Sequence, residues 1–155
     1  MSDATEKSSF QTQKILRDRL TQAGLHPSKR LGQCFLIDRN LMDKLLQSAN
    51  LTQDDCVLEV GCGTGSLTGL LAECVRHVIT VELDSRLADI AREHLDHYTN
   101  VQLLNLDALA NKSTVAPEIE TTVREAIRYT DGHLLLVANL PYDIATPLVV
   151  NLLLG

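Results

Sequence analysis

Four consecutive residues, Asn139-Leu140-Pro141-Tyr142, follow the apolar run 133–138 and bring together an amide, a proline and an aromatic ring. An adenine amine is a poor nucleophile because its lone pair is delocalised into the ring. Two acceptors that hold its hydrogens, the Asn139 side-chain carbonyl and the carbonyl of Leu140 or Pro141, can draw that lone pair out of plane. Proline stiffens this turn, and Tyr142 offers a face for stacking an extruded base. The quartet fits methyl transfer to a planar nitrogen, although an ordinary turn uses the same residue types.

A glycine-rich stretch at 61–65, Gly-Cys-Gly-Thr-Gly, directly follows the apolar run 56–60. Glycines at a strand end allow a sharp turn and let a ligand approach the backbone closely. The spacing is G-x-G-x-G, preceded by Glu59, and differs from the dinucleotide fingerprint G-x-G-x-x-G. Because a plain turn needs one or two glycines, three within five residues favour a ligand-binding loop.

Two acidic residues follow the next two expected strands. Glu82 stands 21 residues after Gly61, where a carboxylate at the end of a second strand accepts hydrogen bonds from ribose hydroxyls. Asp107 follows the third strand and can accept a hydrogen bond from the exocyclic amine of a bound adenine. Each also has a simpler interpretation, Glu82 as a surface carboxylate before a helix and Asp107 as a loop aspartate.

Hydrophobic periodicity alternates between strand and helix along most of the chain, which predicts an α/β fold with a parallel sheet covered by helices on both faces. The pattern predicts strands at 56–60, 77–81, 101–105 and 133–138, and helices at 11–23, 38–49, 67–75, 85–97, 118–129 and 147–154. Ligands in such folds bind beyond the carboxyl ends of the strands. The quartet, the glycine loop and both acids are therefore expected to meet at one edge of the sheet.

Bulk composition limits the class of protein. A chain of 155 residues fits one domain with a sizeable core, and it contains neither a long apolar run nor a secretory leader. The net charge is −6, yet residues 1–40 hold seven Lys or Arg against four Asp or Glu, while residues 41–155 hold seven against sixteen. A basic leading segment is compatible with an RNA-facing edge and equally with a solvated arm.

The cysteines and histidines do not predict a metal site. Cys34, Cys56, Cys62 and Cys74 include no C-x-x-C pair, so we expect reduced thiols in a cytoplasmic protein. His94 and His97 lie one helical turn apart but among acidic residues, so a metal there is not expected.

Four segments together resemble a known family: Ser-Lys-Arg-Leu-Gly-Gln-Cys-Phe-Leu at 28–36, the glycine loop at 61–65, Val-Glu-Leu-Asp at 81–84 and the quartet at 139–142. They look like the ribosomal RNA adenine dimethyltransferases, and most like the bacterial small-subunit type linked to kasugamycin sensitivity. The likeness runs from about Pro27 to the end; its leading element is quite specific, whereas many methyltransferases share the glycine loop. The resemblance implies a Rossmann-like class I fold dependent on S-adenosylmethionine.

The resemblance also assigns roles to particular residues. The target amine is held by Asn139 and the carbonyls that follow, and the target base stacks on Tyr142. The implied cofactor contacts are Cys34, Leu36 and Gly61 at the methionine end, Glu82 at the ribose and Asp107 at the adenine, with Glu59, Gly63, Gly65 and Asn139 completing the site. The family places two methyl groups on each of two neighbouring adenosines near the 3′ end of small-subunit RNA, late in subunit assembly.

The chain departs from the family pattern in three ways. Cys34 stands where the family usually has asparagine or histidine, and the stretch 108–132 is longer than usual, with room for an inserted helix. The family's last strands and helical RNA-binding domain have no counterpart before Gly155, and the apolar helix 147–154 and edge strand 133–138 would be poorly covered. We therefore expect an arm and helix at 1–26, the front part of a catalytic domain at 27–155, and little methylation by this chain alone.

Alternatives remain open at this point. Related sites with Asn-Pro-Pro-Tyr methylate glutamine amides or DNA adenine, and similar enzymes of the antibiotic-resistance type act on large-subunit RNA. A non-catalytic assembly or transcription factor could keep the fold and bind RNA only. The first expectation is a cytoplasmic enzyme, monomeric at full length, that acts on the precursor of the small subunit without metal or membrane.

Overall fold

The computed structural model describes residues 13–22, 24–25, 39–140 and 142–154. Four parallel strands form one sheet in the order β3-β2-β1-β6. The strands are β1 (Cys56–Val60), β2 (His77–Glu82), β3 (Val101–Asn105) and β6 (Leu134–Leu136). The helices are α1 (Gln13–Gln22), α2 (Arg39–Ala49), α3 (Ser66–Cys74), α4 (Ser85–Leu95), α5 (Pro117–Ile127) and α6 (Tyr142–Leu154). The predicted α/β architecture is therefore confirmed.

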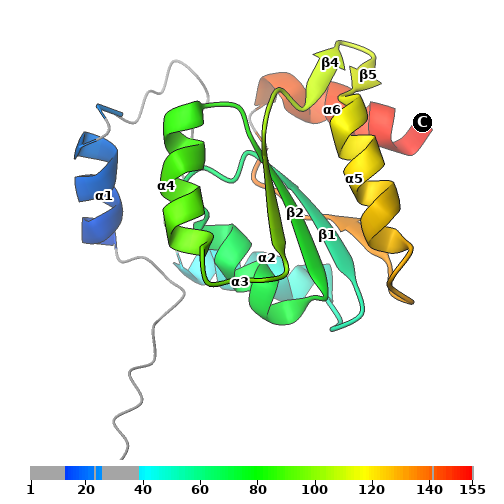
Figure 1. The fold of residues 1–155 in the computed structure, drawn as a ribbon, viewed down its shortest axis with the longest axis horizontal. Helices are drawn as coiled ribbons and strands as arrows, with labels where there is room; N and C mark the ends of the chain where they lie inside the picture. Colours follow the sequence, from blue (N-terminus) through cyan, green and yellow to red (C-terminus); the bar gives the residue numbers. More distant parts are fainter. Residues whose placement is uncertain (1–12, 23, 26–38, 141, 155) are drawn as a thin grey trace, which may run out of the picture.

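Helices cover both faces of the sheet (Figure 1). Alternate strand residues point to opposite faces, so Val57 and Val78 pack with α2 and α3, while Leu58 and Ile79 pack with α5 and α6. Helix α4 covers the end of the first face near β3, and α1 packs against α4 through Leu20. Burial on both faces explains why β1 and β2 read as continuous apolar runs.

A β-hairpin occupies the part of the chain where an inserted helix was considered. Strands β4 (Leu109–Asn111) and β5 (Thr114–Val115) pair antiparallel and lead directly into α5. Asp107 starts the hairpin by accepting the Leu109 N–H at 3.0 Å, and Asn111 accepts the Ser113 N–H at 2.9 Å in the turn. The stretch 108–132 thus holds a short hairpin followed by α5, and local side-chain acceptors favour the turns at Asp107 and Asn111.

The last helix begins five residues earlier than predicted, at Tyr142 rather than at Pro147. Pro147 therefore lies inside α6 and not in its first turn. Pro147 predicted the start of a helix because proline lacks a backbone N–H donor. The prediction was wrong because tertiary packing offsets the loss of that one hydrogen bond inside α6. Leu148, which is 0% exposed within the core cluster under β1, supplies that packing.

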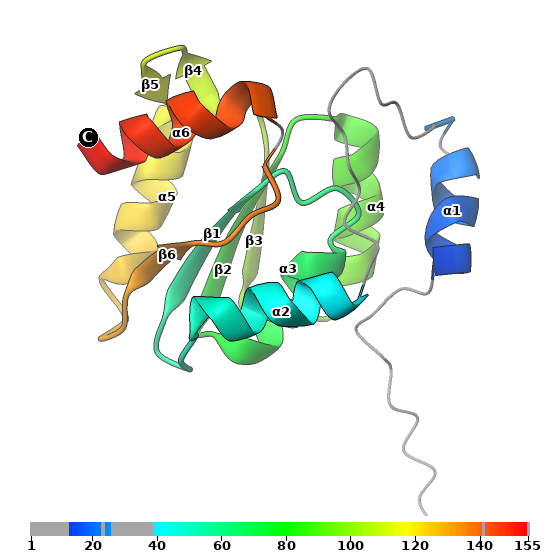
Figure 2. The same cartoon turned by 180° about the vertical axis from the view of Figure 1, so that it is seen from behind.

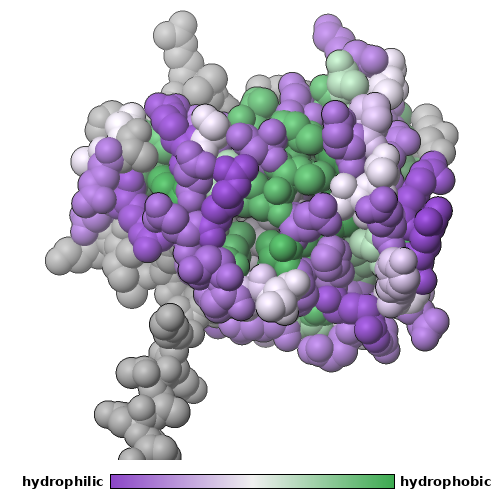
Figure 3. All heavy atoms as spheres, in the orientation of Figure 1, coloured by the Kyte–Doolittle hydropathy of each residue, from purple (hydrophilic) through white to green (hydrophobic). Residues whose placement is uncertain are grey.

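The β6 edge of the sheet carries exposed apolar side chains, and the β3 edge carries partly exposed ones. On the β6 edge, seen from its side in Figure 2, Leu134 and Leu136 are exposed, and α6 exposes Leu153. On the other side, Figure 3 shows apolar residues gathered between α4 and α5, where Figure 1 places β3. Poor cover of the last helix was expected, and the side chains of Val149, Val150, Leu152 and Leu153 on α6 are exposed. None of the helices within the described ranges is long and apolar enough to cross a membrane.

Candidate functional site at the carboxyl edge of the sheet

The glycine loop folds back over the carboxyl end of β2. Gly61, Gly63 and Gly65 all adopt the left-handed conformation, with φ of 80°, 59° and 81°. The Gly61 N–H donates to the Val81 carbonyl at 2.8 Å, which fixes the start of the loop to the neighbouring strand. Residues other than glycine rarely adopt this φ, so the predicted sharp turn is confirmed, while the binding of a ligand to the loop stays a prediction. The loop leads into the first turn of α3.

The carboxylate of Glu82 links this loop to the end of β2. Its Oε2 accepts the Gly63 N–H at 2.8 Å and its Oε1 accepts the Asp84 N–H at 2.9 Å. Burial raises the pKa of Glu82, while the two backbone donors work in the opposite direction. A carboxylate has about four acceptor positions, so both oxygens retain capacity for hydroxyl donors of a ligand.

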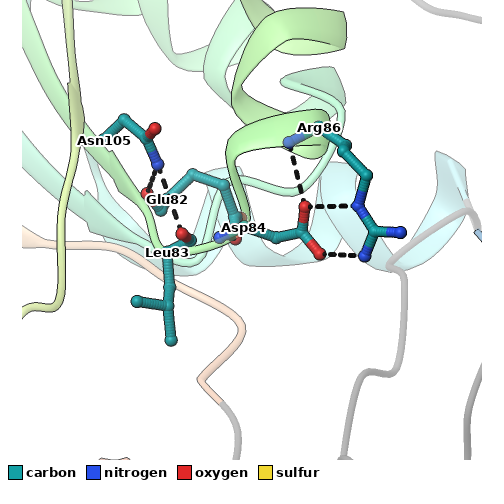
Figure 4. Close-up of polar contacts among 5 residues, drawn as sticks. All are labelled: Glu82, Leu83, Asp84, Arg86 and Asn105. Carbon is teal, nitrogen blue, oxygen red and sulfur yellow. Dashed lines mark hydrogen bonds and ion pairs between the residues drawn. The ribbon is translucent and has the colours of Figure 1, made fainter. Parts of the chain in front are cut away.

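The segment after Glu82 is held by side chains on both sides of it (Figure 4). Asn105, at the end of β3, donates from its amide nitrogen to the carbonyls of Glu82 and Leu83, at 2.7 and 3.3 Å. Asp84 caps α4 by accepting the Arg86 N–H at 2.9 Å and also pairs with the Arg86 guanidinium. Between these anchors Leu83 is 67% exposed, and its side chain points away from the polar cluster.

Glu59 lies beneath the loop and not on the rim of the site. Its side chain is 1% exposed, and Oε2 accepts hydrogen bonds from Thr68 on α3 at 2.5 Å and Thr80 on β2 at 2.7 Å. Burial raises the pKa of Glu59 to about 7, against the lowering effect of both threonine hydroxyls. The contact of Glu59 with a cofactor stays a prediction, and its position favours support of the loop from below.

Strand register brings Asn139 toward the glycine loop. Leu136 pairs with Leu58 in parallel register, and the Val137 N–H donates to the Leu58 carbonyl at 3.0 Å. Continuing this register by the same number of residues on each strand aligns Asn139 with Gly61. Both residues therefore lie at the carboxyl edge of adjacent strands.

The remaining predicted site residues are described only in part. Asp107 is exposed after β3, and its carboxylate caps the hairpin; its contact with adenine stays a prediction. Leu140 is half-buried against the core cluster of β1. Tyr142 opens α6, but its side chain, like Cys34, Leu36 and Pro141, lies outside the described residues.

Sequence reasoning missed two residues at this edge, Asn105 and Leu83. The signal for Asn105 was an amide at the end of a strand, two residues before the predicted site residue Asp107. The signal for Leu83 was its position as an apolar residue between two acids, a pattern that is typical neither of a buried strand nor of a polar surface segment.

Metal and disulfide chemistry find no support in the part of the chain described. No group of His, Cys, Asp or Glu within the described residues is arranged to hold a metal ion. His97 contacts Asp96 at 3.4 Å. Cys56, Cys62 and Cys74 are free thiols, and burial raises the pKa of Cys62 well above its ordinary value.

Comparison with known proteins agrees with this geometry. The family model described as "Ribosomal RNA adenine dimethylase" matches residues 25–154. Relatives named "Ribosomal RNA small subunit methyltransferase A" are 38% identical over 81% of this chain in Alkaliphilus oremlandii and 40% identical over 85% in Lactiplantibacillus plantarum. The chain spans 41% and 42% of the length of these two relatives.

Among solved structures, a dimethyladenosine transferase from Plasmodium falciparum is 31% identical, with a TM-score of 0.57 over 76% of this chain and 38% of that one. The family model's match over residues 25–154 takes in both the glycine loop and the quartet, and the fold is the Rossmann-like α/β fold of class I methyltransferases. From strand order, loop geometry and this match, the chain belongs to the ribosomal RNA adenine dimethylase family.

Proposed function

We propose that the protein transfers methyl groups from S-adenosylmethionine to the N6 amines of two neighbouring adenosines in small-subunit ribosomal RNA. One observation carries this proposal: Leu136 pairs with Leu58 in parallel register, three residues before Asn139 and Gly61 respectively, while Glu82 binds the glycine loop through Gly63. The glycine loop, which would bind the cofactor, and Asn139, which would hold the target amine, are therefore expected at the same edge of the sheet. Membership of the family supports the same reaction.

The residues present fit the cofactor. The left-handed loop exposes backbone near Gly61, and the Glu82 oxygens keep acceptor capacity for ribose hydroxyls. Leu83 offers an exposed apolar surface next to that carboxylate, suited to the face of an adenine ring. When bound, the cofactor supplies an electrophilic methyl group on a sulfonium ion.

The chain's own part in the reaction is to hold and orient the target. The Asn139 side-chain carbonyl and a following backbone carbonyl accept the two amine hydrogens, and this turns the lone pair toward the loop. No general base need act before transfer, because the amine attacks through that lone pair and loses its proton afterwards. Rate enhancement rests on proximity and on stabilisation of the developing positive charge.

The cofactor site is tested by titration calorimetry with S-adenosylmethionine. We expect micromolar binding by the chain and at least a tenfold loss of affinity in Glu82→Ala. Asp89→Ala is the matched control, since it removes an exposed carboxylate on α4 that pairs only with Arg92 among the described residues. Equal affinity in Glu82→Ala and the control would reject the assigned cofactor site.

The target site is tested with radiolabelled methyl transfer to undermethylated small subunits. In an active form of the protein, Asn139→Ala should lose transfer and keep RNA binding. Retained transfer would contradict the role of Asn139. If the Asn139→Ala variant shows the same phenotype as the parent protein and RNA binding is intact, the protein is instead a binding module without catalysis.

The finer assignments follow from the same proposal. The substrate is the small-subunit precursor particle, the protein is cytoplasmic, and the full-length form is a monomer. Labelling large subunits in parallel separates this substrate from the antibiotic-resistance type, which would label only those.

A further inference from the structure

A shallow hollow of about 280 Å³ lies beside Asn139, between α2 and the segment that follows β6. Figure 2 shows α2 running along this side of the sheet, close to the end of β6. The hollow is lined by Leu41, Lys44, Leu45, Ser48, Ala138 and Asn139. None of these residues except Asn139 has a part in the proposed transfer.

Four of the lining residues come from one face of α2. Leu41, Lys44, Leu45 and Ser48 follow the i, i+3, i+4, i+7 spacing, so they share a stripe of the helix. Met42, next to Leu41 in the chain, is fully buried against the core, and Leu45 of the stripe also packs partly against it. Leu41 is 53% exposed, so this end of the stripe presents apolar surface to solvent.

Lys44 is the one cation of this lining, and its charge is available. Its neighbour Asp43 pairs with Arg39 at 2.9 Å, so the nearest carboxylate on the helix is already engaged. No ion pair among the residues that the structure describes involves Lys44. Ser48 donates its hydroxyl to the Lys44 carbonyl at 2.8 Å, which leaves the ammonium as the main polar donor of the helix side of the hollow.

The chain carries a net charge of −6, which works against the binding of nucleic acid at long range. The Lys44 ammonium lies in the same hollow as Asn139, together with the apolar side chains of Leu41 and Leu45. This combination of one positive charge and apolar surface suits an RNA strand. Lysine is a point-charge donor to phosphate, and the leucine side chains suit the carbon face of a sugar or base.

We propose that this hollow binds the sugar–phosphate backbone of the RNA strand next to the target adenosine, with Lys44 contacting a phosphate. This inference rests on the proposed function, since it assigns part of the substrate to the same site. The contact positions the strand and carries no sequence information.

The experiment measures binding of the chain to a short single-stranded RNA that contains two neighbouring adenosines, over a series of KCl concentrations. One phosphate contact contributes about 0.7 to the slope of log K against log salt on single strands. Lys44→Ala should lower the slope by about that amount and weaken binding severalfold at low salt, whereas Lys44→Arg should keep both. The loss should be equal for an RNA whose adenosines are replaced by guanosine.

Arg76→Ala is the matched control. It removes one exposed cation from the amino edge of the sheet, where Arg76 pairs with Asp54 at 2.7 Å, and it should leave the slope unchanged. Calorimetry with S-adenosylmethionine should give the same affinity for Lys44→Ala as for the parent chain, which shows that the site is folded.

Three outcomes overturn the inference. An unchanged slope in Lys44→Ala removes the phosphate contact and leaves the proposed function standing. A loss confined to the adenosine-containing RNA makes Lys44 a base contact instead. Failure of the parent chain to bind any RNA, with cofactor binding intact, overturns the inference together with the proposed RNA substrate.

Discussion

The Glu82 carboxylate accepts the Gly63 N–H at 2.8 Å, and this single hydrogen bond joins the end of β2 to the middle of the glycine loop. The two residues stand 19 positions apart in the chain. Parallel pairing of β1 with β2 brings them together, because Val60 lies opposite Val81 in the register. The loop therefore takes its shape from the strand beside it as well as from its own glycines.

Protonation of Glu59 should make stability depend on pH. Its pKa is raised from 4.5 to about 7 in the folded chain, so below pH 4.5 both states are protonated and the contribution is fully present. As the pH rises toward 7 the unfolded chain releases this proton first, and stability falls by up to about 3 kcal/mol. Urea unfolding across this range should show the decline in the parent chain.

Glu59→Gln is the control for this dependence. Glutamine keeps an oxygen that can accept the Thr68 and Thr80 hydroxyls but cannot ionise. The difference in unfolding free energy between the two proteins isolates Glu59 from Glu82 and His77, which both proteins retain. Parallel pH curves for the two proteins would show that Glu59 does not titrate in this interval.

Gly65→Ala should destabilise the fold more than Gly24→Ala. Both glycines have positive φ, 81° and 69°, so each substitution incurs a left-handed strain of roughly 1–2 kcal/mol. A Cβ at Gly65 would also lie 3.0 Å from Leu95 Cδ1, whereas one at Gly24 meets nothing within 4 Å. We expect an additional loss of about 1 kcal/mol for Gly65→Ala, measured from urea midpoints. Equal losses would mean that Leu95 moves aside freely.

Asn105→Leu should weaken cofactor binding, since its amide holds the carbonyls of Glu82 and Leu83. Asn100→Leu is a close control at the other end of β3, where that amide binds the carbonyls of Ala72 and Val75. Both variants should lose about 1 kcal/mol of stability because partly buried carbonyl acceptors lose a hydrogen bond. Calorimetry with S-adenosylmethionine should show a severalfold weaker affinity for Asn105→Leu alone; similar affinities would make Asn105 purely structural.

Leu83→Ser should lower affinity for the cofactor at little cost in stability. Leu83 is exposed, so its replacement should change the free energy of unfolding by less than about 0.5 kcal/mol. If its side chain covers the adenine face, affinity should fall by about tenfold, in line with the loss of one apolar contact. Leu153→Ser, at a similarly exposed leucine on α6, is the control and should bind as the parent does. A normal affinity for Leu83→Ser would remove Leu83 from the site.

The sequence alone determined the alternation of elements and the sheet edge at which the glycine loop and Glu82 lie. Strong apolar runs such as Cys56–Val60, and glycines that permit positive φ, act locally, so their consequences can be read without coordinates. The hairpin at Leu109–Val115 was missed because its strands are too short to show a period. The start of α6 was misplaced because Pro147 is a local signal that burial of Leu148 overrides.

Only the tertiary structure decided which contacts each candidate residue makes. Glu59 and Glu82 look alike in sequence, as acids at neighbouring strand ends, yet one is buried beneath two threonine hydroxyls and the other binds the loop backbone. Thr68 and Thr80 stand 9 and 21 positions from Glu59, and Gly63 stands 19 from Glu82, so the pairing register of β1 and β2 sets which of them meet. Contacts of that kind depend on the packing of separate elements, which no local pattern encodes.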